Sequence, residues 1–366
     1  MLLSLLKLGI GTIKASDEDC QKLLQLSMQE WRNVMVLAER QGVLAIAVDG
    51  LQALMETHKE ELLAIKEAPA KWQMWLLEII GQLTQYEMMN RLQKKVIAKL
   101  SEIWAAEGIR MMVFKGQANA ALYPKPEHRA VGDIDCWLFG DAEKGDEIAK
   151  VHGADVLFDW YRHSKIAYKG ETIENHRVMS HTRGSKKKQK MEGVLRSMLN
   201  SADLPMIDGC GKALMPSPQF NACFLTYHGL HHFTSEGLRM KQILDWAMFL
   251  QKEQNEVDWK QYNDFCKRYK LDRFAAVMNF IASEYLGAHI NSSDIMVDGT
   301  FAEKIIQSTL YDDDYLFNSG KSDWTVRWLL VKNMLTRDKW KYRDIAQQNV
   351  WMQLWQNITG FISNKD

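Results

Sequence analysis

The sequence predicts an α+β fold in which a small mixed-sheet core is flanked by N-terminal and C-terminal helical regions. Five of the six prolines lie between residues 124 and 218, and none follows Pro218. Proline breaks helix interiors, so the proline-poor flanks are predicted to be helical and the proline-rich middle to be mixed. We therefore expect a helical region over 1–105, an α+β core over 106–215 and a helical domain over 216–366.

Each flank carries apolar residues at helical spacing. The N-terminal region ends in a stripe with i, i+4, i+8 and i+11 spacing, and the C-terminal region has a stripe with i, i+1, i+4 and i+7 spacing. These residues are Leu92, Val96, Leu100 and Ile103 in the first flank, and Ile243, Leu244, Ala247 and Leu250 in the second.

The middle region has short apolar runs bounded by turn residues. Residues 110–114 and 133–139 are predicted strands, and 117–123 is a predicted short helix that Pro124 ends. Residues 165–168 and 172–178 are predicted to pair as a hairpin around a turn that contains glycine. The basic run from His181 to Lys190 is predicted to be a polar loop.

Charge and cysteine content exclude several classes of protein. Lys plus Arg and Asp plus Glu both number 46, so no global field attracts nucleic acid or an anionic membrane. The five cysteines are scattered and contain no CxxC pair, which favours the reducing cytoplasm. No apolar run of about 18 uncharged residues occurs, so a membrane partner is not expected.

Asp133 and Asp135 form the most informative motif. On a strand, side chains at i and i+2 share one face about 7 Å apart, so both carboxylates reach the same side while Ile134 packs inward. Magnesium prefers such hard oxygen ligands together with phosphate oxygens. Glu174 is the best candidate for a third acid on a neighbouring strand, because Ile173 would face inward and Glu174 outward.

Several nearby residues are candidates for phosphate contacts. Gly116 lies at a strand-to-helix turn, where backbone N–H groups approach phosphate, and Lys115 adds positive charge. Arg129 could hold the aspartate loop or pair with phosphate, and the structural role is favoured. Arg239 and Lys241 could reach a triphosphate across a cleft or form a solvated helix face.

His228, His231 and His232 share one face of a predicted helix. That face could hold zinc or contact phosphate, but only Asp245 is an obvious fourth ligand, so packing or substrate contact is favoured. The lysine-rich run from Lys186 to Lys190 could track RNA, although the zero net charge favours a solvated loop. The C-terminal tryptophans at helical spacing are interpreted as core residues: Trp324, Trp328, Trp340, Trp351 and Trp355.

The passage from Val113 to Leu138 resembles the polymerase-beta-like nucleotidyltransferase superfamily. It is most similar to the uncharacterised nucleotidyltransferase family, whose members read LKG, a short helix, YP, Arg and GDIDLLV. The similarity extends over most of residues 25 to 250 through further matching segments: Trp31 with Leu37–Ala38 and Gln41–Val43, Glu174–His176, Pro218–Asn221, Tyr227–His228, His231–Phe233, Gly237–Arg239 and Leu244–Asp245.

The resemblance implies a catalytic and metal-binding triad of Asp133, Asp135 and Glu174, with Gly116 at the turn that meets the triphosphate. One departure is Gln117, which follows the motif glycine where many active members of the superfamily have Ser or Gly. We include it in the predicted cofactor-binding set: Lys115, Gly116, Gln117, Arg129, His231 and Arg239.

The implied activity is magnesium-dependent, or manganese-dependent, transfer of an NMP from an NTP to an acceptor hydroxyl. Pyrophosphate leaves in this reaction, and the acceptor could be a sugar, a metabolite, a protein side chain or an RNA end, RNA being less favoured. The alternative is a catalytically degenerate nucleotide- or partner-binding module on the same fold, because a fold does not guarantee activity.

Overall fold

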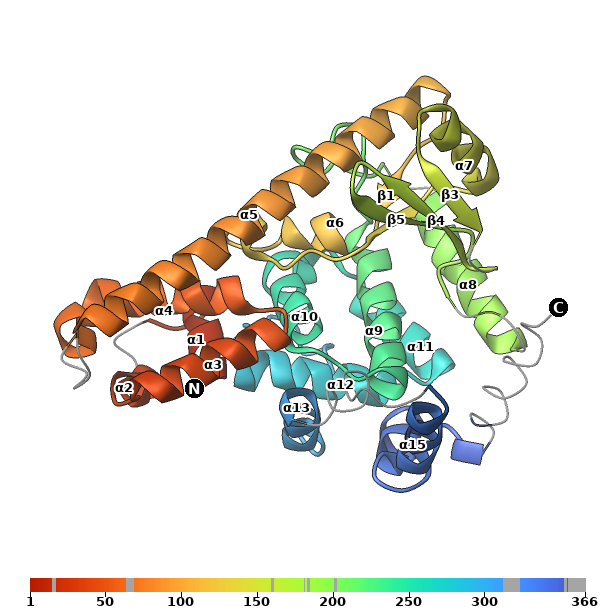
Figure 1. Ribbon diagram of the computed structural model, residues 1–366. Coiled ribbons are helices and arrows are strands. Elements are labelled where there is room, and N and C mark those ends of the chain that lie inside the picture. Colours follow the sequence, from red (N-terminus) through yellow and green to blue (C-terminus); the bar gives the residue numbers. More distant parts are fainter. Residues whose placement is uncertain are drawn as a thin grey trace.

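The chain folds into a five-stranded mixed sheet that packs beside a large assembly of helices (Figure 1). The computed structural model describes residues 1–14, 18–63, 69–158, 161–180, 182, 185–200, 203–311, 323–351 and 354. The α+β prediction is confirmed. Among the described residues, none of the helices combines the length and the apolar character that a membrane crossing requires.

The sheet has the strand order β1-β2-β5-β4-β3. β2 and β5 run parallel, and every other neighbouring pair is antiparallel. The predicted strands and hairpin are confirmed, with β1 and β2 shorter than predicted and the hairpin beginning two residues earlier, whereas β3 was not predicted. The strands are β1 Met112–Val113, β2 Ile134–Trp137, β3 Asp155–Phe158, β4 His163–Tyr168 and β5 Glu171–His176.

A two-residue turn fixes the register of the β4–β5 hairpin. Lys169 and Gly170 have φ values of 50° and 85°, the left-handed pair that closes a tight hairpin with the right twist. The turn pairs Tyr168 with Glu171, and the ladder continues until His163 lies opposite His176. The two histidines therefore share one face of the sheet.

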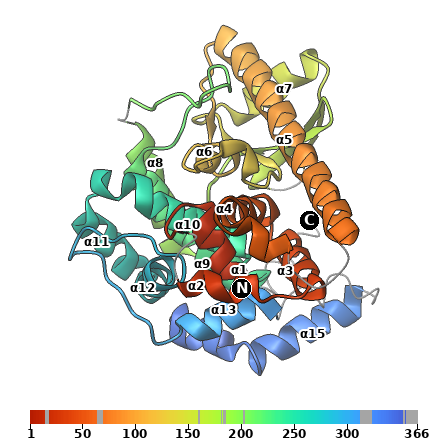
Figure 2. The ribbon, with the colours of Figure 1, turned by 90° about the vertical axis from the view of Figure 1, so that its left-hand side faces the viewer.

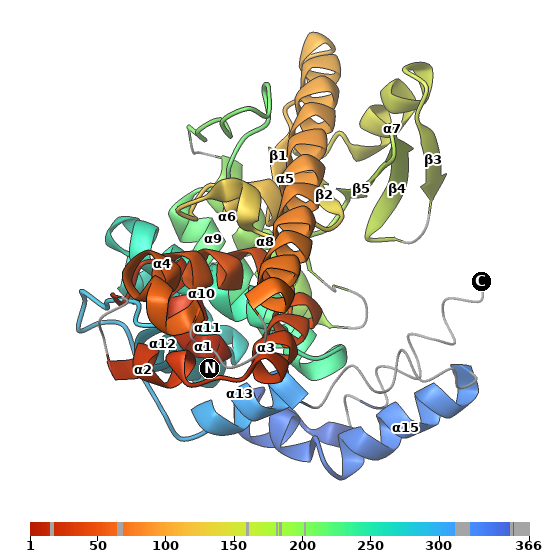
Figure 3. The ribbon, with the colours of Figure 1, turned by 60° about the vertical axis from the view of Figure 1, so that its left-hand side comes forward.

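The N-terminal helices form one end of the molecule, and the last of them reaches the sheet. Figure 3 shows α5 running from the N-terminal helices past the sheet. Gly50 permits the close crossing of α1 and α4, because an added Cβ would lie 2.0 Å from the Leu5 carbonyl oxygen. The helices are α1 Leu2–Gly9, α2 Glu18–Leu24, α3 Met28–Arg40, α4 Leu44–Leu63 and α5 Pro69–Ala106.

Short helices lie between the strands, and the elements that follow β5 in the described residues are all helices. In Figure 2, α9 to α12 gather beside α1 and α4, with α13 and α15 at the lower edge. The connecting elements are α6 Gly116–Ala120, η1 Pro126–His128, α7 Ala142–Val151 and α8 Lys186–Asn200. The C-terminal elements are α9 Pro218–Ser235, α10 Met240–Glu253, η2 Gln254–Glu256, α11 Trp259–Tyr269, α12 Asp272–Phe280, η3 Ile281–Tyr285, α13 Ala302–Tyr311, α15 Asp323–Leu335 and η4 Lys341–Ile345.

The prediction that the lysine-rich run forms a loop is wrong. Lys186 to Lys190 begin helix α8 and are not a loop, because α8 has an apolar face that packs inward through Met191 and Leu195. Residues 181, 183 and 184 lie outside the described residues.

The tryptophan prediction holds at one position. Trp340 is buried, but Trp328 and Trp351 are 55% and 67% exposed, so helical spacing did not place them in a core. The side chain of Trp324 and the whole of Trp355 lie outside what the structure describes. In the N-terminal stripe, Leu92 is likewise exposed while its other three members are buried.

Two large hydrophobic cores form most of the interior of the described residues. One contains apolar side chains from α1 to α5 together with those of α9 to α13, and the other lies under the sheet. Helix α5 contributes to both, through Trp72 and Trp75 at one end and Leu100 and Trp104 at the other. The long helix therefore connects the sheet to the helical assembly.

A buried ion pair links the loop before β2 to helix α10. Arg129 Nε and Nη2 donate to Asp245 Oδ1 and Oδ2, both at 2.7 Å. Tyr123 Oη and Asn119 Nδ2 donate to the same carboxylate at 2.8 and 3.1 Å. Burial opposes ionisation of Asp245, but the Arg129 charge and these hydrogen bonds outweigh it and lower its pKa.

We expect Asp245→Asn to lower the free energy of unfolding by about 3 kcal/mol, because it leaves the buried Arg129 charge without a counter-ion. Urea denaturation measures the change. The matched control is Glu127→Gln, which breaks the exposed pair with Arg91 and should cost no more than about 1 kcal/mol. Equal losses in the two variants would contradict the assignment.

Candidate active site

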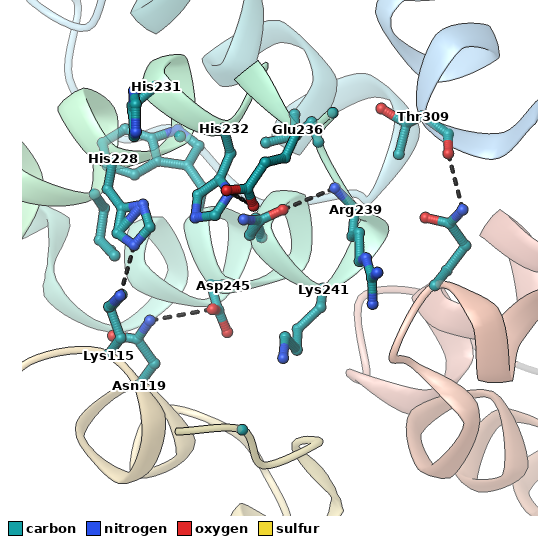
Figure 4. A pocket seen from close by; sticks show the side chains of 18 of the residues that line it. Lys115, Asn119, His228, His231, His232, Glu236, Arg239, Lys241, Asp245 and Thr309 are labelled. Atoms are coloured by element: carbon teal, nitrogen blue, oxygen red, sulfur yellow. Dashed lines mark hydrogen bonds and ion pairs between the residues drawn. The ribbon is translucent and has the colours of Figure 1, made fainter. Parts of the chain in front are cut away.

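One cavity of about 1090 Å³ lies where the sheet, α6, α9 and α10 meet. Its volume is at the upper end of ordinary ligand pockets. Figure 4 shows side chains of α6, α9 and α10 directed toward the open space between these elements. Gln41, just after α3, closes one side by donating to the Thr309 carbonyl at 2.8 Å and accepting from the Met240 N–H at 2.9 Å.

The three predicted acids come together on one wall of this cavity. Asp135 on β2 lies directly opposite Glu174 on the parallel strand β5, and Asp133 immediately precedes β2. Desolvation, followed by repulsion from Glu174 and Asp135, raises the pKa of Asp133. The pairing of β2 with β5 thus gathers three carboxylates within one charged cluster.

Lys115 supplies the closest positive charge. Its Nζ lies 2.8 Å from Asp135 Oδ1 and 2.6 Å from His228 Nε2. Its backbone has φ 75° and ψ −154°, a conformation that is costly for a residue with a side chain. Burial opposes ionisation of Asp135, but the Lys115 ammonium and a hydrogen bond from His176 outweigh it and hold its pKa below the usual range.

Two histidines of the hairpin lie beside the acids. His176 Nε2 is 3.0 Å from Asp135 Oδ1 and 3.4 Å from Glu174 Oε2, and His163 Nε2 is 3.6 Å from Glu174 Oε1. Burial disfavours the His176 imidazolium, but its hydrogen bonds to Asp135 and Glu174 outweigh burial and raise its pKa. Burial likewise opposes ionisation of Glu174, but the hydrogen bond from His176 and the positive charges of His163 and His176 together outweigh it and lower that pKa.

Gly116 and Gln117 take different positions at the start of α6. Gly116 lines the cavity with φ 47°, and an added Cβ would meet nothing within 4 Å, so this part of the wall is open. Gln117 is buried, and its Nε2 donates to Asn90 Oδ1 at 2.8 Å and to Gln93 Oε1 at 3.1 Å. The side chain of Gln117 packs against α5 and does not line the cavity, so a cofactor contact stays a prediction for its backbone only.

Arg129 also differs from its predicted place in the cofactor-binding set. Although it borders the cavity, its guanidinium is committed to Asp245 and to the Ala130 carbonyl. The structural role that the sequence favoured is the one that the geometry supports.

The α9 histidines line another wall of the cavity (Figure 4), and Lys115 joins this wall to the acids because its Nζ contacts both His228 and Asp135. Burial, the Lys115 charge and the neighbouring histidines lower the pKa of His228 well below its ordinary value, and burial with His232 lowers that of His231 to about 3. His232 Nδ1 lies 3.3 Å from Glu236. Within the described residues these three histidines do not form a group with metal-ligand spacing, so the zinc site considered for them lacks support.

Cations at the start of α10 complete this wall. Arg239 and Lys241 both line the cavity, and Figure 4 shows both side chains directed into it. Burial lowers the pKa of Lys241 to about 8, and the positive charge of Arg129 contributes to the shift. Within the part of the chain that the structure describes, the Lys241 ammonium has no ion-pair partner closer than 4 Å.

Sequence reasoning missed several residues that line the cavity. Arg40, Arg162 and Lys165 add positive charge, and His163 and Asn119 add polar groups. Of these, only His163 and Lys165 could have been predicted from the sequence. The two-residue turn fixes the hairpin register, and continuing the first strand of the hairpin back to residue 163 places both residues on the face that carries Glu174.

The carboxylates provide the donor set that magnesium requires. Asp133, Asp135 and Glu174 all face the cavity, and their mutual repulsion is the condition that a divalent cation relieves. The residues therefore fit a magnesium ion at this wall.

Comparison with known proteins places the chain in a family. No curated protein and no solved structure matches it. The family model described as an uncharacterised nucleotidyltransferase matches residues 27–287, which include the acids, the cationic wall and the Arg129–Asp245 pair. The chain therefore belongs to the uncharacterised nucleotidyltransferase family.

Proposed function

We propose that the protein is a magnesium-dependent nucleotidyltransferase that moves an NMP from an NTP to an acceptor hydroxyl and releases pyrophosphate. The observation that supports this most directly is the cluster of Asp133, Asp135 and Glu174 on adjacent strands at one wall of a large cavity. The lining of the same cavity also contains cations, as a polyphosphate substrate requires.

The acids would hold magnesium, or manganese in its place. When bound, the cation supplies positive charge that offsets the charge of the phosphates. The residues of the chain then orient the substrates: Lys115 holds Asp135 toward the cavity, and Gly116 leaves room for a phosphate against the backbone. Catalysis by such an arrangement is mainly positioning and charge neutralisation.

The transfer balances as an in-line displacement. The acceptor oxygen bonds to the α-phosphorus while the bond from that phosphorus to the bridging oxygen breaks, and pyrophosphate leaves with the electron pair. The hydroxyl proton passes to a carboxylate of the cluster, for which Glu174 is placed beside Asp135.

A binding module without turnover is the second candidate, and one observation favours it. Asp135 already receives the Lys115 ammonium and His176 in this structure, so its charge is compensated without a metal ion. In that case nucleotide would bind without pyrophosphate release.

Asp133→Asn/Asp135→Asn should abolish magnesium-dependent NTP binding, because it removes two of the three carboxylates. Calorimetry with each of the four NTPs measures binding, and a pyrophosphate assay with candidate acceptors measures turnover. Asp155→Asn is the matched control, since Asp155 is exposed on β3 of the same sheet and does not line the cavity.

The proposal fails if no NTP binds the wild type, or if the double variant and the control bind equally well. Binding that is lost in the double variant without turnover against any acceptor would favour the second candidate. Thermal unfolding of both variants shows whether a loss of binding reflects a loss of fold.

The desolvated Lys241 ammonium gives a pH-dependent test of the cationic wall. Its pKa is depressed when folded, so the charge costs stability below about pH 8, and the cost disappears as pH rises through the unfolded value. Lys241→Met should therefore stabilise the nucleotide-free protein by on the order of 2 kcal/mol at pH 7, and less at higher pH.

Urea denaturation at several pH values measures this difference. Lys252→Met is the matched control, because Lys252 is exposed in the last turn of the same helix and should show no such gain. A Lys241→Met variant that is less stable than the wild type at pH 7 would show that the ammonium is already compensated.

A further inference from the structure

The β4–β5 hairpin places two imidazoles and a carboxylate on the face of the sheet that borders the cavity. His163 and His176 are directly opposite in the ladder, with ring centroids 5.1 Å apart. Glu174 lies two residues before His176 and therefore on the same face. This placement is set by backbone register and does not depend on a flexible loop.

The three side chains have the spacing of metal ligands. One ligand atom from each of His163, Glu174 and His176 lies within 4.8 Å of the other two. The Nε2 atoms of His163 and His176 are 3.6 and 3.4 Å from the two oxygens of Glu174. Ligand atoms around a tetrahedral zinc ion are roughly 3.4 Å apart, because bonds of about 2.1 Å meet at tetrahedral angles.

The surroundings of His176 also suit a metal ligand. Its Nδ1 lies 3.4 Å from the Val178 carbonyl oxygen, which can only accept a hydrogen bond. Nε2 faces the oxygens of Asp135 and Glu174, so a metal ion bound there would replace the proton that Nε2 donates to these carboxylates. A cation between Nε2 and these carboxylates satisfies all of the groups, and a backbone carbonyl on the far nitrogen is the usual support for a metal-binding histidine.

We propose that His163, Glu174 and His176 form a site for a zinc-class transition-metal dication, beside the proposed magnesium-binding acids. Two imidazoles and one carboxylate are donors that zinc binds well, whereas magnesium favours oxygen ligands. His163 and Glu174 line the cavity, so a fourth position is available to water or a substrate oxygen.

Glu174 belongs to both donor sets, and this makes the two cations competitors for one carboxylate. The zinc-class cation keeps two imidazole ligands in that competition, which magnesium does not replace. Millimolar magnesium should therefore weaken zinc binding without abolishing it.

The test titrates metal-free protein with Zn²⁺ alone, without nucleotide, so its result is independent of the proposed transfer activity. Calorimetry should show one equivalent bound by the wild type, and His163→Asn should weaken the affinity by at least about tenfold. His232→Asn is the matched control, because His232 also lines the cavity beside a carboxylate, that of Glu236, but comes from α9 (Figure 4). Its affinity for Zn²⁺ should equal that of the wild type.

Cobalt substitution of the wild type provides a readout that needs no variant. Co²⁺ held by imidazoles in four-coordinate geometry should give intense visible absorption, and octahedral Co²⁺ held by oxygens gives only weak bands. Weak bands, the absence of stoichiometric Zn²⁺ binding, loss of zinc in the His232→Asn variant alone, or full displacement by millimolar magnesium would each overturn the proposal.

Discussion

The parallel pairing of β2 with β5 brings Asp135 and Glu174 side by side, and the rest of the cavity is arranged around the resulting repulsion. Carboxylates this close stay ionised together only when cations face them. Lys115 and His176 provide that compensation for Asp135. Asp133 receives less compensation, and desolvation together with repulsion from Glu174 and Asp135 raises its pKa. The sheet register thus creates both the binding potential of the site and its need for positive charge.

Keeping that register beside the α9 and α10 wall requires a rigid connection between the two cores. The Arg129–Asp245 pair supplies it, because both groups are buried and the carboxylate also accepts from Tyr123 and Asn119. Asn119 and Tyr123 belong to the segment that follows Gly116, and Asp245 lies one helical turn beyond Lys241. This buried charge pair therefore connects the segment that follows Gly116 to the helix that carries Lys241.

The acid strands and the hairpin could be predicted because their signals are local. Alternation around Ile134 and Ile173, with a glycine turn, defines strands and faces without knowledge of the remaining fold. The position of His163 beside the acids could also have been predicted, because the two-residue turn places it opposite His176. It was missed because the predicted hairpin started two residues too late.

Other features depend on tertiary contacts that local patterns do not contain. The lysine run suggested a loop, but burial of Met191 and Leu195 makes it the start of an amphipathic helix. Trp328 lies at helical spacing from Trp324, and its side chain is nevertheless exposed. Helical spacing identifies a face, and only packing determines whether that face is covered.

Gln117 shows how such contacts change a functional argument. In the sequence it stands where many active members of the superfamily have Ser or Gly, and this departure makes a degenerate protein conceivable. Its side chain instead packs against α5 and bonds Asn90 and Gln93, so its identity reflects the support of α6. Whether the protein turns over a substrate therefore depends on Asp135 more than on Gln117. A metal ion bound by Asp135 would have to displace the Lys115 ammonium or share the carboxylate with it.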